Sequence, residues 1–147
     1  MGAYQDIREE CCAANRALPA TGLVDLTFGN VSVADRAKAV FAIKPSGVDY
    51  NRLRPEDMVV VDYDGRVVEG SLRASSDTDT HRRLLAAFDG IRSVVHTHSR
   101  TAVACAHREH EVLAVHAGSD RDVRVLGALH AHERTREVAR VVYLRLR

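Results

Sequence analysis

The stretch Ile91-Arg92-Ser93-Val94-Val95-His96-Thr97-His98 is an apolar run that ends in a pair of histidines. A short run rich in valine and isoleucine is typical of a buried strand, so we predict a strand here. Side chains alternate between the two faces of a strand, which places His96 and His98 on the same face. Their Cα atoms would then lie about 6–7 Å apart, close enough for both imidazoles to hold one metal ion.

Asp77 is the carboxylate that we expect beside this pair. It follows Ser75-Ser76 at the start of a predicted helix over 78–88, and that helix leads back into the strand of His96. A catalytic metal site needs about three protein ligands and an open position, and Asp77 would complete the three. The alternative is a pair of histidines at a sheet edge that bond to backbone or water. We expect His81 to form a surface pair with Asp77, with a role as metal ligand or orienting partner as the alternative.

Three short segments have the composition of an anion site. Small and hydroxyl residues in turns allow backbone N–H groups to converge on phosphate oxygens, and a helix N-terminus favours the same ligand. The segments are Gly29-Asn30, Ser46-Gly47 and Ser75-Ser76. Lys44 adds a cation next to the second segment. Each turn alone also has the ordinary explanation that turns favour these residues for conformational reasons.

The composition is that of one globular domain. The chain has 147 residues, 46% hydrophobic and 28% charged, with a formal net charge of +1. This charge balance does not favour nucleic acid, and no run approaches the roughly 18 apolar residues of a membrane span. The N-terminus has no signal-peptide pattern, so we expect a cytoplasmic protein with reduced, buried thiols at Cys11, Cys12 and Cys105.

Hydrophobic periodicity and turn signals predict the order of the elements. Several strands with a hairpin come first, and strands then alternate with helices, which favours an α/β fold with helices against a mixed sheet. The predicted elements are a helix over 4–17, a strand with a sharp return at Gly29-Asn30 over 23–33, a strand over 40–43, a hairpin over 58–69, helices over 78–88 and 100–110, and the strand over 91–98.

The charge pattern changes near residue 118. Residues 1–120 carry 14 Lys and Arg against 17 Asp and Glu, whereas residues 121–147 carry 7 Arg, no Lys and 3 acids. We therefore divide the chain into a domain over 1–118 and a divergent, Arg-rich C-terminal segment of the same domain over 119–147.

Motifs over about residues 5–105 resemble those of the class II aldolase/epimerase superfamily, and most closely those of the L-ribulose-5-phosphate 4-epimerases. The order and spacing of these motifs match as well as their letters. The matching stretches are Leu26-Thr27-Phe28-Gly29-Asn30-Val31-Ser32, Ile43-Lys44-Pro45-Ser46-Gly47-Val48-Asp49-Tyr50, Asp57-Met58-Val59-Val60-Val61, Val67-Val68-Glu69-Gly70, Ser75-Ser76-Asp77-Thr78 with His81, and Val94-Val95-His96-Thr97-His98-Ser99-Arg100.

The resemblance implies a three-layer α/β/α sandwich with a mainly antiparallel central sheet, a divalent metal that is commonly Zn²⁺, and a homo-tetramer. It implies metal ligands at Asp77, His96 and His98, and a further ligand at His132 from the His-x-His stretch over 129–133. The implied contacts with a phosphorylated sugar are Gly29, Asn30, Ser46, Gly47, Ser75 and Ser76, and we add Lys44 to this set.

The implied reaction converts L-ribulose 5-phosphate to D-xylulose 5-phosphate by retro-aldol cleavage and re-addition. Related fuculose-phosphate aldolases tend to have Glu where this chain has Asp77, which favours the epimerase branch. The family carries an acid/base Asp in a His-Ala-Asp segment; here the segment is His116-Ala117-Gly118, and Asp120 is the candidate. After about residue 105 the chain is truncated or divergent relative to the family, so an aldolase or a non-catalytic homologue that keeps only the fold core stay open.

Overall fold

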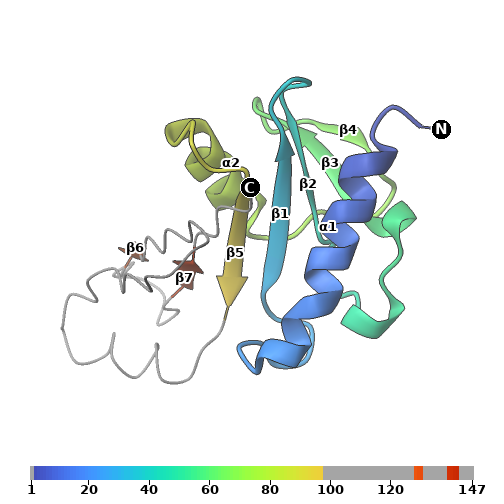
Figure 1. Cartoon of the computed structure of the whole chain (residues 1–147), viewed down its shortest axis with the longest axis vertical. Coiled ribbons are helices and arrows are strands. Elements are labelled where there is room, and N and C mark those ends of the chain that lie inside the picture. The colour runs from blue at the N-terminus through green and yellow to red at the C-terminus, as the bar shows by residue number, and fades with distance from the viewer. Residues whose placement is uncertain (1, 98–127, 131–138, 143–147) are drawn as a thin grey trace, which may run out of the picture.

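The computed structural model of the chain describes residues 2–97, 128–130 and 139–142. Within these residues, the strands form one sheet in the order β4-β3-β2-β1-β5-β7-β6, and neighbouring strands are antiparallel (Figure 1). The strands are β1 (Asn30–Asp35), β2 (Val40–Ile43), β3 (Val59–Asp62), β4 (Val67–Glu69), β5 (Ser93–Thr97), β6 (Ala128–His130) and β7 (Ala139–Val142). The helices are α1 (Gln5–Ala17), α2 (Thr78–Ala87) and the short 3₁₀ helices η1 (Leu18–Thr21), η2 (Tyr50–Arg52) and η3 (Pro55–Asp57).

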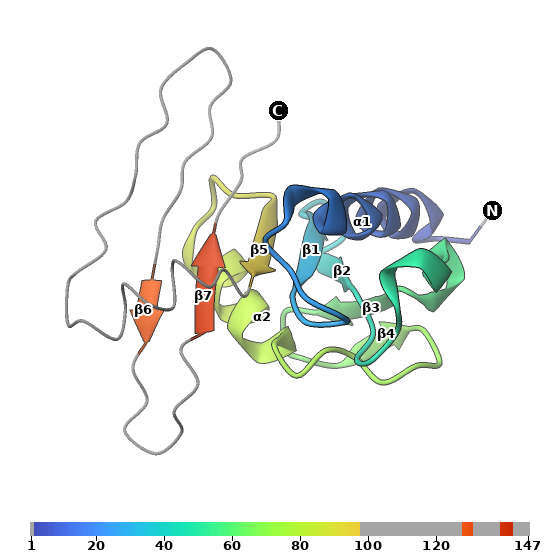
Figure 2. The ribbon, with the colours of Figure 1, turned by 90° about the horizontal axis from the view of Figure 1, so that it is seen from below.

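The two α-helices lie on opposite faces of the sheet, as Figure 2 shows for α1 and α2 on either side of β1. Alternation along the strands divides their side chains between two cores. The core under α1 includes Ile7, Cys11, Val31, Val33 and Val95, and the core under α2 includes Phe41, Ile43, Val61, Leu85 and Val94. The predicted α/β/α sandwich with a mainly antiparallel sheet is confirmed.

Helix α1 is attached to β1 by a buried amide as well as by apolar packing. Asn15 is fully buried, its Nδ2 donates to the Val31 carbonyl at 2.9 Å, and its Oδ1 accepts from the Val31 N–H at 2.8 Å. Cys11 lies one turn earlier as a buried free thiol, and burial raises its pKa. The amide of Asn15 therefore fixes the helix next to Asn30, where β1 begins.

The predicted hairpin around Asp64-Gly65 is confirmed by β3 and β4. Gly65 has a φ of +88°, the left-handed conformation that glycine adopts without steric cost. The Asp62 carboxylate accepts from the backbone N–H groups of Asp64 and Arg66, at 3.0 and 2.8 Å. The turn residues thus set the register of the strands that flank them.

The strand predicted over 23–33 is wrong in its first half, because β1 begins only at Asn30. Gly22 and Gly29 have φ values of +68° and +87°, and Leu26 has +54°, so the backbone between them is not extended. Leu26 and Phe28 are exposed. Gly29-Asn30 is therefore the entry into β1 and not the tip of a hairpin.

The strand register brings the two ends of the predicted site together. In the antiparallel pair of β1 and β5, Asn30 lies opposite His96. On its other side β5 pairs with β7, where His96 lies opposite Val141. The helix predicted over 100–110 lies outside the described residues. None of the described helices has the length and apolar composition needed to cross a membrane.

Candidate active site

Asp77 is the centre of a polar cluster at one end of the sheet. It precedes α2, and its Oδ2 atom lies 2.8 Å from Nδ1 of His96 near the end of β5. The same oxygen accepts from Nδ2 of Asn30, at the start of β1, at 2.6 Å and from Oγ of Ser75 at 3.3 Å. Asp77 makes no side-chain cap to α2, because its carboxylate is directed to the strands instead. The structure thus brings Asp77 and His96 together, as their positions in the sequence predicted.

The Asp77 carboxyl is ionised at neutral pH. Burial alone would raise its pKa, but the hydrogen bond and charge of His96 and the hydrogen bond from Asn30 more than offset burial, so the pKa lies well below its usual value. An ionised carboxylate only accepts hydrogen bonds, so the His96 Nδ1 atom carries the proton between them. In a neutral His96 ring this contact would leave the lone pair on Nε2, the arrangement typical of metal-binding histidines.

His81 is not the surface residue that we expected. It is fully buried on the side of α2 that faces the sheet, and its Nδ1 atom lies 2.7 Å from Oγ of Ser32 on β1. Burial lowers its pKa to about 3, with Asp77 acting in the opposite direction, so the ring is neutral at pH 7. Its Nε2 atom is buried without a hydrogen-bond partner among the described residues. The prediction of a surface pair with Asp77 is therefore wrong.

Ser32 is a site neighbour that the sequence reasoning missed. It is fully buried in a central strand, between two valines whose side chains face the other core. A hydroxyl at an inward position of an otherwise apolar strand was the signal, because a buried polar side chain requires a partner. His81, one helical turn after Asp77, is that partner.

Gly29 allows the loop before β1 to approach β5 closely. A Cβ atom at this position would lie 2.9 Å from the carbonyl oxygen of His96 and 2.7 Å from Cγ1 of Val24. The left-handed φ of +87° disfavours any other residue for a second reason. The backbone of Gly29 therefore lies directly against the His96 peptide.

The three predicted anion segments are neighbours in the structure. Asn30 Nδ2 donates to Ser75 Oγ at 3.2 Å, which joins the first segment to the third. The N–H of Ser46 donates to the carbonyl of Arg73 at 2.9 Å, and Pro45 forms an isolated bridge with Ala74, which joins the second segment to the third. Ser76 is exposed on the same loop.

Lys44 is a buried lysine that forms no ion pair with a carboxylate of the described residues. Its side chain is 2% exposed, and its Nζ atom donates to the carbonyls of Thr27 and Pro45 at 3.3 and 3.4 Å. Within the described part of the chain, no carboxylate lies within ion-pair distance of this atom. Burial lowers the pKa of Lys44, and the charge of Asp49 acts against that shift. Such a group is costly to bury unless it meets an anion.

Asp77 and His96 offer a carboxylate oxygen and an imidazole nitrogen, the donor types that bind zinc. Asn30 Oδ1 is a further buried polar atom without a partner in the described part of the chain. The residues present therefore fit a divalent metal, although no set of three or more potential ligands occurs among the described residues. The other predicted site residues, His98, Asp120 and His132, lie outside those residues.

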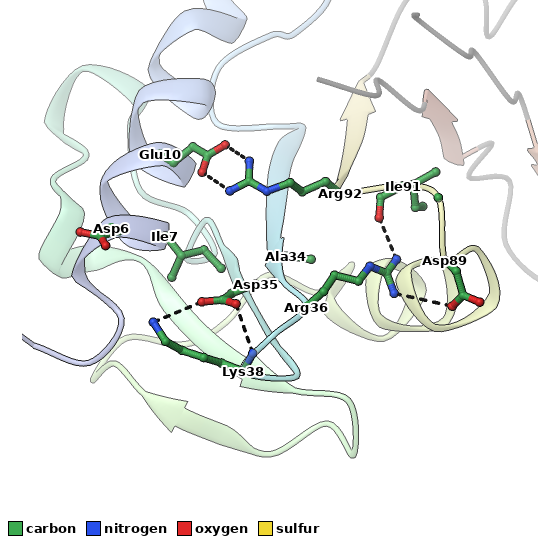
Figure 3. A pocket seen from close by; sticks show the side chains of 11 residues that line it. Asp6, Ile7, Glu10, Ala34, Asp35, Arg36, Lys38, Asp89, Ile91 and Arg92 are labelled. Carbon is green, nitrogen blue, oxygen red and sulfur yellow. Dashed lines mark hydrogen bonds and ion pairs between the residues drawn. The ribbon is translucent and has the colours of Figure 1, made fainter. Parts of the chain in front are cut away.

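A cavity of about 530 Å³ lies at the other end of β1 and β5, away from the cluster (Figure 3). Its cationic residues are all engaged with acids of the cavity wall. Arg36 pairs with Asp89, Lys38 with Asp35 at 3.2 Å, and Arg92 with Glu10. This cavity is not part of the candidate active site.

Comparisons with known proteins agree with the fold. The family described as "Class II Aldolase and Adducin N-terminal domain" matches residues 9–144. L-ribulose-5-phosphate 4-epimerase UlaF of Salmonella paratyphi C is 50% identical over 102 residues, which are 69% of this chain and 45% of that protein. The chain thus spans about half the length of the curated relatives it matches.

Similar solved structures belong to class II aldolases as well. A structure titled L-fuculose 1-phosphate aldolase has a TM-score of 0.66 and 35% identity, over 72% of this chain and 49% of that one. L-fuculose-1-phosphate aldolase from Thermus thermophilus has a TM-score of 0.60 and 34% identity, over 74% of this chain and 55% of that one.

Proposed function

The chain belongs to the class II aldolase and adducin N-terminal domain family, and we propose that it is a metal-dependent sugar-phosphate epimerase. The proposed reaction converts L-ribulose 5-phosphate to D-xylulose 5-phosphate. The observation that supports this proposal most strongly is the juxtaposition of two groups at one end of the sheet. An ionised Asp77 is hydrogen-bonded to His96, and Lys44, which is buried without an ion-pair partner among the described residues, belongs to the adjoining turns.

The proposed metal ligands are Asp77, His96, His98 and His132. Asp77 carries the negative charge of the set, and its contact with His96 orients that ring. A bound divalent ion such as Zn²⁺ would polarise the ketone of the substrate and stabilise the negative charge that develops on its oxygen. Asn30 and Ser75 hold the Asp77 carboxylate in place by donating hydrogen bonds to it.

The proposed phosphate site consists of Lys44 and the three turns. Lys44 would supply the charge, and the turns would supply backbone N–H groups and hydroxyls. The proposed contacts are Gly29, Asn30, Ser46, Gly47, Ser75 and Ser76. Because Asn30 belongs both to this set and to the Asp77 cluster, the phosphate and the reacting carbons of one small sugar would both be within reach.

Epimerisation at C4 also needs a proton acceptor and donor at the C4 hydroxyl. The hydroxyl loses its proton as the C3–C4 bond breaks, and it regains one when the aldehyde fragment, turned to its other face, forms the bond again. We propose Asp120 for this role. Since the bond that breaks is re-formed, the reaction consumes no co-substrate.

The proposal is tested with the zinc-loaded full chain and L-ribulose 5-phosphate. We expect D-xylulose 5-phosphate to form, and both His96→Ala and Lys44→Met to lose turnover. Lys38→Met is the matched control, because that lysine is half-exposed and bonded to Asp35. A folded, zinc-loaded chain that does not convert the substrate would contradict the epimerase assignment.

An aldolase of the fuculose-phosphate type is the second candidate. It is favoured by the likeness to two solved structures with that title at 34–35% identity. Cleavage of L-fuculose 1-phosphate without epimerisation of L-ribulose 5-phosphate would assign this activity instead. Zinc binding with neither reaction would indicate a non-catalytic homologue.

A further inference from the structure

Tyr50, in the short helix η2, contacts both halves of the proposed phosphate site. We infer that Tyr50 is a positioning residue for this site: its ring holds the ammonium of Lys44, and its hydroxyl holds the peptide groups around Gly29. The inference rests on the proposed function, because it explains how that anion site is kept in shape.

The Tyr50 hydroxyl fixes the entry into β1. Tyr50 is 3% exposed, and its Oη atom lies 2.7 Å from the carbonyl oxygen of Gly29 and 2.9 Å from that of Phe28. The hydroxyl proton is shared between these two successive carbonyls, and so it restrains the peptide planes on both sides of Gly29. Asn30, which donates to Asp77, follows directly. A single hydroxyl thus restrains the loop that belongs to both the anion turns and the Asp77 cluster.

The Tyr50 ring holds the cation without neutralising it. The Nζ atom of Lys44 lies 4.8 Å from the ring centroid, within the range of a cation–π contact. An aromatic face attracts an ammonium group through its quadrupole and carries no net charge. The ring therefore leaves the charge of Lys44 available to an anionic ligand.

Lys38 shows the contrasting arrangement in the same chain. Its Nζ atom lies 5.8 Å from the centroid of the Tyr4 ring, but also 3.2 Å from the carboxylate of Asp35. A carboxylate partner of this kind competes with an incoming phosphate for the same ammonium. Lys44 has a ring and carbonyl oxygens in place of that carboxylate.

The local sequence explains how Tyr50 reaches Lys44 from six positions away. After β2 ends at Ile43, Gly47 turns the backbone with a φ of +73°. Asp49 is the N-cap of η2, and its carboxylate accepts from the N–H of Asn51 at 2.8 Å. The turn and the cap together return Tyr50 beneath the lysine.

Binding of inorganic phosphate to the full chain, with an NMR signal of the Lys44 side chain, tests the inference. In Tyr50→Phe we expect the lysine signal to be kept and phosphate affinity to fall by less than tenfold, because the ring remains. In Tyr50→Leu we expect the lysine signal to shift and affinity to fall by roughly tenfold or more. Tyr63→Leu is the matched control, because Tyr63 is a partly buried tyrosine that packs in the other core.

Three outcomes would overturn the inference. A wild-type chain that binds no phosphate would overturn both this inference and the proposed phosphate site. A wild-type chain that binds phosphate, and a Tyr50→Leu variant that binds it equally with an unchanged lysine signal, would overturn only the role of Tyr50. Equal losses of affinity in Tyr50→Leu and Tyr63→Leu would show that Tyr50 acts only through the stability of the core. Should Tyr50→Leu fail to fold, Tyr50→Met replaces it with a side chain of closer size.

Discussion

At the scale of single residues, Lys44 is the residue that folding alone does not explain. Burying an ammonium group without a carboxylate costs free energy that carbonyl oxygens and one ring only partly offset. Buried titratable groups with a shifted pKa cluster at functional sites. The residue therefore links the energetics of the fold to the proposed binding of a phosphorylated sugar.

Lys44→Met tests this link. We expect the variant to be as stable as the wild type or more stable, by about 1–2 kcal/mol, because a methionine of similar length removes the desolvation cost. We also expect it to lose phosphate binding. Urea unfolding and phosphate titration measure the two effects. A clear loss of stability would show that the ammonium group serves the fold. Lys38→Met, at a partly exposed ion pair, should change stability by less than about 0.5 kcal/mol.

Tyr50 makes the stability of the fold depend on pH in the alkaline range. Burial raises its pKa to about 12, from the ordinary value of 10. Between those values the unfolded chain releases the phenolic proton and the folded chain keeps it, so stability falls as pH rises, by at most about 1.4 kcal/mol per pH unit. The lysine at the ring, Lys44, is the same residue in the wild type and in Tyr50→Phe.

Comparing the wild type with Tyr50→Phe isolates the effect of the Tyr50 hydroxyl on stability. Because phenylalanine does not titrate, the advantage of the wild type over Tyr50→Phe should shrink between about pH 10 and pH 12. Urea unfolding of both chains at several pH values measures this difference. A difference that does not vary with pH would mean that the phenol titrates normally in the folded chain.

Two glycines in the anion segments make a matched pair. A Cβ at Gly29 would meet the His96 carbonyl and the Val24 side chain, whereas at Gly47 it would meet nothing within 4 Å. Both have left-handed φ values. We expect Gly47→Ala to cost about 1 kcal/mol from backbone strain and Gly29→Ala clearly more. Equal costs in thermal unfolding would contradict the close approach at Gly29.

The residues show where sequence reasoning succeeds and where it fails. The short distance between Asp77 and His96 could be predicted from the sequence, because the helix that begins after Asp77 leads directly into the strand of His96. The burial of His81 did not follow, because the helical period indicates which residues share a face but not which face a polar residue takes. The charge of Lys44 predicted it as a site residue, but the sequence around it does not indicate that Tyr50 lies beneath it.

At the scale of elements, the contact between α2 and β1 positions Asp77. His81 on α2 and Ser32 on β1 form a fully buried hydrogen bond one turn after Asp77. Together with Leu85, which packs in the same core, this bond fixes the start of α2 over the sheet. The proposed metal-binding carboxylate is thus held by its helix as well as by its own hydrogen bonds.

A double-mutant cycle measures this contact. Ser32→Ala leaves the His81 Nδ1 atom buried without its partner, and we expect a loss of about 1–3 kcal/mol in the free energy of unfolding. The double variant with His81→Leu should recover part of that loss, because no polar atom is then left unpaired. Strictly additive effects of the two substitutions would show that the side chains do not interact.

The elements also explain the one strand that was predicted wrongly. Alternating apolar residues over 23–28 have the pattern of a strand, but left-handed backbone at Gly22, Leu26 and Gly29 makes this segment a loop. An alternating apolar pattern identifies a strand only if the backbone of that segment stays extended. The hairpin at Asp64-Gly65 was predicted correctly because its turn needs a left-handed residue, and Gly65 supplies it.

At the scale of the whole molecule, the antiparallel sheet places the residues of the candidate active site at one of its ends. Asn30 at the start of β1 and His96 near the end of β5 meet because the strands run in opposite directions. The opposite end holds the cavity whose cations are internally paired (Figure 3). The family and the sandwich followed from the resemblance of the motifs, whereas the pairing of β7 with β5 depends on long-range contacts that a linear pattern does not reveal.

The central claim is that Asp77 and His96 bind a divalent metal. Its most direct test is a zinc titration of the full chain, measured by calorimetry, with Asp77→Ala and His96→Ala as test variants. Asp79→Ala is the control, since Asp79 lies on the exposed side of the same helix. We predict about one zinc ion per wild-type chain, the same for the control, and a loss of affinity of about 100-fold or more in both test variants, with helical content unchanged. Zinc binding that is absent from the wild type, or equal in all four chains, would contradict a metal site built on Asp77 and His96.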